Sequence, residues 1–291
     1  MRCISMNGTT IENGIIILIK KAETELPQDV SKALRHAYTI EEGIAKIQIE
    51  TILKNIELAQ KSGRPLCQDT GIQTFFVSIG VDSPFMKNIK QTLYDAVRKA
   101  TIEIPLRPNT VEPFTGKNHG DNTGNYIPSI TWDFTTGSDI RINALPKGGG
   151  SENMSRLGML KPGVGIEGVK NFIINEVIKA GGSPCPPTVI GVGIGGGADI
   201  AMKLAKMALL RPVGGRHSDH AIAEIEKELI NKINSSGIGP MGLGGKTTVL
   251  DVHIEKAHRH PASLPVGISV QCWADRRSSM VIHANGNWEV E

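Results

Sequence analysis

Several stretches of the chain repeat apolar residues with the period of an amphipathic helix. One of them has its i, i+3, i+4 and i+7 positions filled by Ile49, Ile52, Leu53 and Ile56. Gly63 and Pro65 then end this helix. Further helices are predicted around 33–37, 89–100, 167–179, 199–210 and 222–233. Short apolar stretches between turn residues predict strands at 74–79, 127–134, 140–145, 188–192, 247–254, 266–271 and 279–283.

The order of these elements indicates a mixed α/β (α+β) fold. Helices and strands interleave along the chain, and residues 105–126 contain too many prolines and glycines for a regular element. The sequence has no internal repeat, low-complexity linker or clear domain boundary. We therefore expect one large unit, which could have two lobes, with the functional side chains at element edges and in loops.

Composition and charge exclude several classes of protein. Of the 291 residues, 40% are hydrophobic and 21% are charged, which is typical of a folded protein rather than a disordered one. The formal net charge of +3 is too small to indicate a surface for nucleic acid. The apolar run 15–19 is too short for a membrane span or a secretory signal. We expect a cytoplasmic protein that binds neither membrane nor nucleic acid and has no disulfides.

The four cysteines are dispersed along the chain. None belongs to a CxxC pair, which excludes a zinc ribbon and a thioredoxin-type motif. Cys67, Cys185 and Cys272 each lie at the edge of a predicted element, where side chains can converge on one point. Residue type and spacing leave two interpretations open, namely three buried apolar thiols or the ligands of an iron–sulfur cluster.

A glycine-rich segment offers a different chemistry. Gly191, Gly193 and Gly196 fit the GxGxxG pattern of a dinucleotide fingerprint between a strand and a helix. The acidic residue that should follow at the end of the next strand is missing, because Asp219 lies where no strand is predicted. A glycine-lined turn whose backbone amides face an anion is the favoured alternative.

Two further patterns are ambiguous. The segment 244–248 is similar to a phosphate-binding loop, but Pro240 occupies the position of the first glycine of a Walker motif. His253, His258 and His260 lie within eight residues, which allows a metal triad. Strand alternation would separate His253 from the other two, so roles at the surface or behind a site are favoured.

Four motifs resemble those of class I, iron–sulfur-dependent fumarate hydratases. They are RPLCQDTG at 64–71, LRPNT at 106–110, KGGGSEN at 147–153 and DVHIE at 251–255. The related α subunit of L-tartrate dehydratase has the same plan. The resemblance runs in order from about residue 12 to the C-terminus, which predicts one catalytic domain at 12–291 and an extension at 1–11 that includes Cys3.

The resemblance implies a [4Fe–4S] cluster held by three cysteines. Cys67, Cys185 and Cys272 stand at the matching positions, and the fourth iron keeps an open site. That iron would act as a Lewis acid toward the substrate hydroxyl and a carboxylate. Expulsion of hydroxide, a poor leaving group, is the step that needs this assistance.

The resemblance also implies roles for five further residues. Gln68 and Asp69 follow the first ligand and are expected beside the open iron, with Asp69 as a proton-transfer group. Arg107 is similar to a clamp for a substrate carboxylate, to which its planar guanidinium is suited. Gly150 is expected to offer a backbone contact to the substrate. His260 resembles the active-site histidine of the family, which would orient Asp69 and the substrate.

The sequence departs from the single-chain members of this family at its C-terminus. It ends at Glu291, before the domain that contributes a threonine base and further arginine and lysine contacts in those proteins. The chain therefore resembles the α subunit of a hetero-oligomer whose separate β subunit carries the missing groups. We expect the chain alone to hold the cluster but to hydrate fumarate poorly or not at all. Lys147 is an additional candidate for a cationic group of the site.

These observations support one leading hypothesis and three alternatives. The leading hypothesis is the α subunit of a fumarate hydratase, a hydro-lyase that interconverts fumarate and (S)-malate. An L-tartrate dehydratase, converting tartrate to oxaloacetate, would use the same chemistry on another small dicarboxylate. An NAD-linked oxidoreductase would use the glycines at 191–196. A catalytically silent partner of a β enzyme would leave the three cysteines dispensable.

Overall fold

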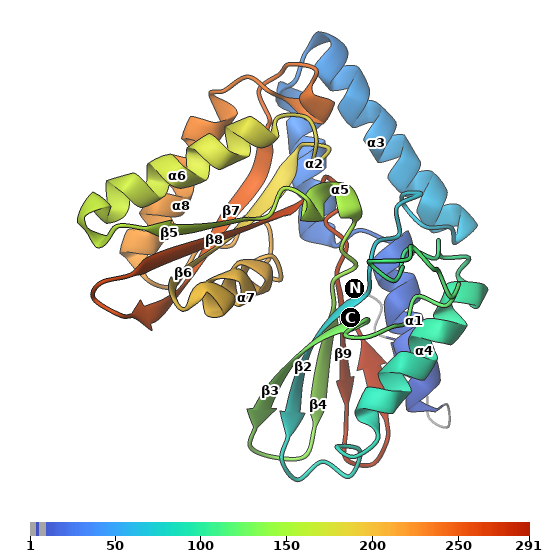
Figure 1. Cartoon of the computed structure of the whole chain (residues 1–291). Helices are drawn as coiled ribbons and strands as arrows, with labels where there is room; N and C mark the ends of the chain where they lie inside the picture. The colour runs from blue at the N-terminus through green and yellow to red at the C-terminus, as the bar shows by residue number, and fades with distance from the viewer. Residues whose placement is uncertain (1–3, 6–9) are drawn as a thin grey trace. The chain divides into compact units, whose positions relative to one another are not determined.

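Two units divide the chain in the computed structural model, which describes residues 4–5 and 10–291. Unit 1 comprises the segments up to Pro27, 56–148 and 276–291, and unit 2 comprises 28–55 and 149–275. Helices alternate with the strands of two mixed sheets (Figure 1), which confirms the α+β class. Cys3 lies outside the described residues, and the domain boundary expected near residue 12 stays a prediction.

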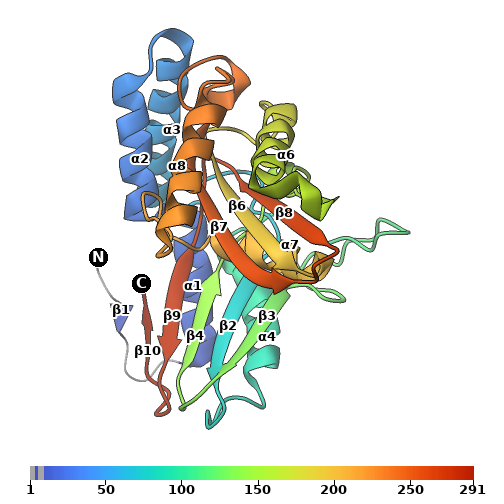
Figure 2. The ribbon, with the colours of Figure 1, turned by 90° about the vertical axis from the view of Figure 1, so that its left-hand side faces the viewer.

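A six-stranded sheet forms the centre of unit 1, in the order β1-β10-β9-β4-β2-β3. Its strands are β1 (Ile4–Ser5), β2 (Thr74–Gly80), β3 (Ser129–Thr135), β4 (Ile140–Ala144), β9 (Ser278–Ile282) and β10 (Trp288–Val290). β2 and β3 pair in parallel, and the other neighbours are antiparallel. Helices α1 (Ile11–Thr24) and α4 (Ile89–Glu103) cover one face of this sheet and form the core with it (Figure 2).

Helix α1 is not among the elements that the sequence predicts. The continuous apolar run 15–19 hides the helical period, because it leaves no polar position between the apolar ones. In the structure, Ile15, Leu18 and Ile19 have no exposed surface. The hydroxyl of Thr10 begins the helix by accepting a hydrogen bond from the Asn13 amide.

Unit 2 contains a four-stranded sheet in the order β5-β8-β6-β7. Its strands are β5 (Arg156–Leu160), β6 (Thr188–Gly196), β7 (Val249–Arg259) and β8 (Leu264–Gln271). β6 and β7 are parallel, and β8 is antiparallel to both β5 and β6. Helices α6 (Gly165–Ala180) and α8 (His220–Asn234) bury their apolar faces against one side of the sheet, and α7 (Ala198–Ala208) packs on the other.

The remaining helices lie outside the two sheet-and-helix cores. α2 (Gln28–Ile40) belongs to unit 2, and α3 (Gly43–Ser62) begins in unit 2 and ends in unit 1. α5 (Gly149–Glu152) is a single turn, and short 3₁₀ turns occur at Pro162–Val164 and Pro240–Gly242. Within residues 4–5 and 10–291, no helix combines the length and the apolar composition that crossing a membrane requires.

The glycines of the GxGxxG pattern have a packing role. Gly191 and Gly193 lie inside β6 and face α7. A Cβ on Gly191 would lie 2.0 Å from the carbonyl oxygen of Ala205, and one on Gly193 would lie 2.1 Å from that of Ala201. Glycine therefore lets the helix backbone rest directly on the strand. A dinucleotide fingerprint belongs in the turn between strand and helix, so this placement disfavours the NAD interpretation.

Candidate functional site

Cys67 lines a concavity of about 300 Å³ in unit 1. The loop that carries it connects the end of α3 to β2. The lining residues are Arg64, Pro65, Cys67, Gln68, Thr70, Pro105 and Arg107. Three of the residues expected to act together, Cys67, Gln68 and Arg107, thus surround one space. Two guanidinium groups and an amide beside a half-buried thiol make this space suited to a small anion.

A network of polar side chains attaches the Arg107 segment to the Cys67 loop. The Arg107 amide donates to Thr70 Oγ1 at 3.1 Å, and Asn109 Nδ2 donates to the carbonyl of Gly71 at 3.1 Å. Asn122 accepts from the Asn109 amide at 2.7 Å and donates to the Arg107 carbonyl at 3.1 Å. Neither Asn109 nor Asn122 is predicted as a site residue from the sequence, although Asn109 lies in the LRPNT motif. These bonds fix the backbone from which the Arg107 side chain extends.

Asp69 closes a tight turn beside Gly148. Its Oδ1 accepts from the Gly71 amide at 3.0 Å, and its Oδ2 would lie 3.0 Å from a Cβ on Gly148. Lys147 is buried and forms two backbone hydrogen bonds of 3.0 Å with Ile72. The turn therefore gives Asp69 the capping role that any aspartate could have, and its half-buried side chain lies in the same loop as Cys67.

Cys185 and Cys272 lie side by side in unit 2. Cys185 precedes β6, Cys272 follows β8, and the pairing of Val189 with Gln271 puts both at the same end of the sheet. The Trp273 amide donates to the Cys185 carbonyl at 3.1 Å. Both side chains are half-buried.

Gly150 and His260 differ in their relation to these two cysteines. A Cβ on Gly150 would lie 3.6 Å from the carbonyl oxygen of Ser183, so Gly150 adjoins the Cys185 loop. His260 is exposed in the turn between β7 and β8, where its Nδ1 accepts from the Ala262 amide at 3.1 Å. This turn is at the opposite end of β8 from Cys272. Within one copy of unit 2, the structure does not bring His260 to the cysteines.

The three predicted cluster ligands are divided between the units, with Cys67 in unit 1 and Cys185 and Cys272 in unit 2. Among residues 4–5 and 10–291, no three His, Cys, Asp or Glu side chains form a group that could hold a metal ion, so the histidines 253–260 form no triad. The donor chemistry nevertheless fits an iron–sulfur cluster. All three are half-buried thiols in loops at strand or helix ends, and thiolates are the usual ligands of such clusters.

The DVHIE motif at 251–255 serves as a structural anchor in unit 2. Asp251 has no exposed surface, and both its oxygens lie 2.5 Å from Arg216 Nη2. Burial opposes ionisation of Asp251, but hydrogen bonds from His253 and Arg216 outweigh it and hold the pKa of this carboxyl below its usual value. The Gly214 amide also donates to Asp251 at 2.6 Å. The motif therefore ties β7 to the loop that follows α7.

The glycine-rich segment 244–248 binds an anion of the chain itself. The amides of Lys246 and Thr247 donate to the buried carboxylate of Glu41 at 2.6 to 3.0 Å. Lys246 Nζ lies 2.8 Å from Glu42. The resemblance of this segment to a phosphate loop thus reflects real donors, but Glu41 already occupies them.

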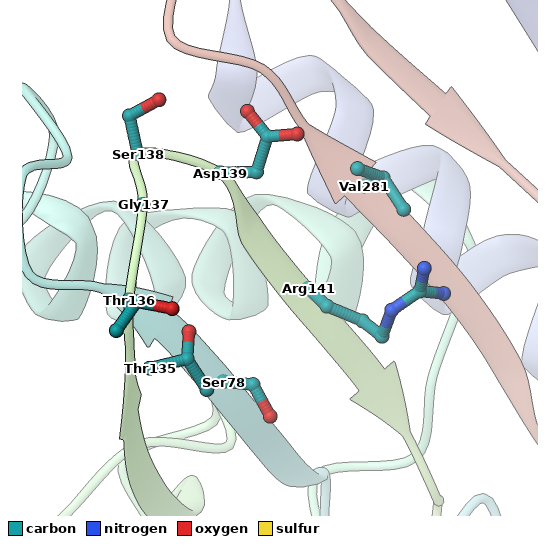
Figure 3. A pocket seen from close by; sticks show the side chains of 8 residues that line it. All are labelled: Ser78, Thr135, Thr136, Gly137, Ser138, Asp139, Arg141 and Val281. Carbon is teal, nitrogen blue, oxygen red and sulfur yellow. The ribbon is translucent and has the colours of Figure 1, made fainter.

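A second concavity, of about 500 Å³, lies on the outer face of the six-stranded sheet (Figure 3). Ser78, Arg141 and Val281 line it from three strands, together with the turn 135–139. At its edge, Asp139 pairs with His283 at 3.0 Å. None of the residues expected in the active site lines this surface, so it is separate from the Cys67 concavity.

Comparison with known proteins gives consistent matches over most of the chain. The model of the family "Fumarate hydratase (Fumerase)" matches residues 13–281. A Methanocaldococcus jannaschii protein named "Putative L(+)-tartrate dehydratase subunit alpha" is 52% identical over 273 residues, covering 92% of this chain and 96% of that protein. The L(+)-tartrate dehydratase subunit alpha of Escherichia coli O157:H7 is 40% identical over 268 residues, and that of strain K12 is 39% identical; each match covers 91% of this chain and 88% of the relative.

Proposed function

The chain belongs to the fumarate hydratase family of hydro-lyases, and on that premise we propose that it is the α subunit of an iron–sulfur L-tartrate dehydratase. The observation that carries this proposal is the concavity in which Cys67, Gln68 and Arg107 meet. The names of the relatives favour tartrate over the fumarate hydratase expected first from the sequence. Both substrates are small hydroxy-dicarboxylates or their dehydration products.

The proposed cofactor is a [4Fe–4S] cluster held by Cys67, Cys185 and Cys272. When bound, such a cluster with one open iron supplies a Lewis acid for departure of the substrate hydroxyl. The half-buried state of all three thiols supports this assignment, since it leaves them accessible while excluding part of the solvent.

The residues around Cys67 are assigned to binding and proton transfer. The Arg107 guanidinium would hold one substrate carboxylate through two parallel hydrogen bonds, on a backbone fixed by Thr70 and Asn122. The exposed amide of Gln68 would bind a second oxygen of the substrate. The protonated carboxyl of Asp69 would donate its proton to the departing hydroxyl, which leaves as water, and would itself become the carboxylate.

Gly150 and His260 lie in different places in unit 2, and only Gly150 is assigned a role within its own copy of the chain. The backbone amide of Gly150 is proposed to contact the substrate, since this glycine adjoins the loop of Cys185. His260 receives no role within its own copy of the chain, because it lies at the other end of the four-stranded sheet.

A separate β subunit is proposed to complete the enzyme as a hetero-oligomer. The relatives are named as alpha subunits, and the chain spans 96% and 88% of the lengths of two of them. The β subunit would supply the base that removes the carbon-bound proton. The chain alone should then bind iron but show little or no dehydratase activity.

Anaerobic preparation of the chain with its β subunit tests the proposal. We expect iron and sulfide in the complex, and a higher kcat/KM for L-tartrate than for fumarate or (S)-malate. Cys67→Ser should abolish both the cluster and the activity, whereas Cys3→Ser, outside the family match, should preserve them. Preference for fumarate would make the enzyme a fumarate hydratase. Full activity in a Cys67→Ser complex would instead support a silent partner and refute the proposed role.

A further inference from the structure

A buried ion pair lies directly against the Cys67 loop in unit 1. Glu23 has no exposed surface, Arg276 is 1% exposed, and Arg276 Nη1 lies 2.8 Å from Glu23 Oε2. The buried Gln73 donates from Nε2 to the other carboxylate oxygen at 2.8 Å. Burial raises the pKa of Glu23 to about 7, against the opposing effect of the Arg276 charge. Neither Glu23 nor Arg276 lies in any of the four family motifs.

The pair holds the loop at one point on each side of Cys67. The Leu66 amide, just before Cys67, donates to the backbone carbonyl of Glu23 at 2.8 Å. The carbonyl of Asp69, two residues after Cys67, accepts from Arg276 Nη2 at 3.0 Å. The backbone between these anchors carries Cys67, Gln68 and Asp69. Both anchors bind the backbone of the loop and use no side chain of those three residues.

Stability alone does not account for this arrangement. Desolvation of two charges costs several kcal/mol, and well-packed apolar residues in place of a buried pair are often as stable or more so. The Arg276 guanidinium uses one terminal nitrogen for Glu23 and the other for the loop carbonyl. A lysine has a single nitrogen and lacks this fixed fork. The pair therefore serves to fix the orientation of the Cys67 loop.

The sequence position of Arg276 adds a second connection to the site. It follows Cys272 by four residues. One short stretch of chain therefore carries a proposed cluster ligand and the guanidinium that anchors the loop of another.

We propose that Glu23 and Arg276 are positioning residues that fix the Cys67 loop for binding the cluster and the substrate. This inference rests on the proposed function, because it takes Cys67 as a ligand. A loop held before the cofactor arrives loses less conformational entropy on binding it, and holds its ligand more tightly against loss.

Arg276→Lys in the full chain tests the inference through thiol reactivity. In cluster-free protein, we expect iodoacetamide to label Cys67 about tenfold faster than in the wild type, as loss of one charge-assisted hydrogen bond implies. The labelling rates of Cys185 and Cys272, followed by peptide mass spectrometry, should change little. Arg216→Lys is the matched control, since Arg216 is likewise paired with a buried carboxylate, that of Asp251, within unit 2.

Cluster retention provides a second readout. In the reconstituted complex, iron loss to a chelator should be about tenfold faster in Arg276→Lys than in the wild type or in Arg216→Lys. If Arg276→Lys does not fold, Glu23→Gln, which keeps the side-chain size, carries the same expectations. Unchanged Cys67 labelling in the folded variant overturns the inference. A wild-type complex without iron would refute the proposed function instead, and the labelling of Cys67 would still decide whether the pair positions the loop.

Discussion

Replacement of Gly71 by alanine probes how the Cys67 loop is attached to the rest of unit 1. Gly71 has a φ of +69°, and a Cβ there would lie 2.5 Å from the carbonyl carbon and oxygen of Lys147. The left-handed backbone costs alanine about 1 kcal/mol. Moving Lys147 away breaks its two hydrogen bonds with Ile72, at about 1 kcal/mol each. The expected loss of unfolding free energy is therefore about 3 kcal/mol.

Gly63→Ala is the matched control for this change. Gly63 has a φ of +63° in the same connection, but no atom lies within 4 Å of its potential Cβ. We expect Gly63→Ala to cost about 1 kcal/mol, the backbone contribution alone. Urea unfolding, followed by circular dichroism, measures both variants. Equal losses in the two variants would refute the argument that contact with Lys147 holds the loop.

Three further predictions concern separate features. Arg107→Lys retains the charge but loses the planar guanidinium, so we expect KM for the dicarboxylate to rise about tenfold or more, with a smaller change in kcat. An unchanged KM in steady-state assays would show that Arg107 does not bind the substrate carboxylate. Gly193→Ala should destabilise the protein by about 1–3 kcal/mol in thermal unfolding, since its Cβ would meet the Ala201 carbonyl of α7 at 2.1 Å; a wild-type melting temperature would contradict this. Because the folded pKa of Glu23 is raised from 4.5 to about 7, the folded state binds the proton more tightly, and stability is lost as pH rises through that interval. Relative to Glu23→Gln, the wild type should lose about 2.5 kcal/mol between about pH 5 and about pH 8 in urea unfolding, and parallel pH profiles would show that Glu23 titrates normally.

The pattern of apolar and polar residues correctly predicts those helices and strands that have a regular spacing of apolar positions. The strand expected at 74–79 is β2, and the helix expected at 222–233 lies within α8, because alternation and helical periodicity are properties of neighbouring residues. Helix α1 escapes this reasoning, since its continuous apolar run has no period. Gly191 and Gly193 fit the pattern of a nucleotide-binding motif, but their role is to let the backbone of α7 pack closely on β6. This role becomes visible only when the position of α7 is known.

The candidate site was predictable where motifs carry it and not where distant residues meet. The family motifs pointed to Cys67, Gln68 and Arg107, which the structure arranges around one concavity. Glu23 and Arg276 are 253 positions apart, and no spacing rule connects them. A buried charge is costly unless an opposite charge lies beside it. The folded chain brings the two side chains together, so the pair cannot be recognised from the sequence alone.

The interrupted path of the chain through unit 1 sets the order in which its sheet can be completed. β9 lies between β10 and β4, yet it follows the whole of unit 2 in the sequence. A ribosome thus releases β2, β3 and β4 long before the strand that must cover the free edge of β4. That edge presents unpaired amides and carbonyls during translation, which makes it a place where nascent chains can pair wrongly with one another. Slow synthesis between residues 149 and 275 would prolong this exposure and lower the yield of correctly folded protein.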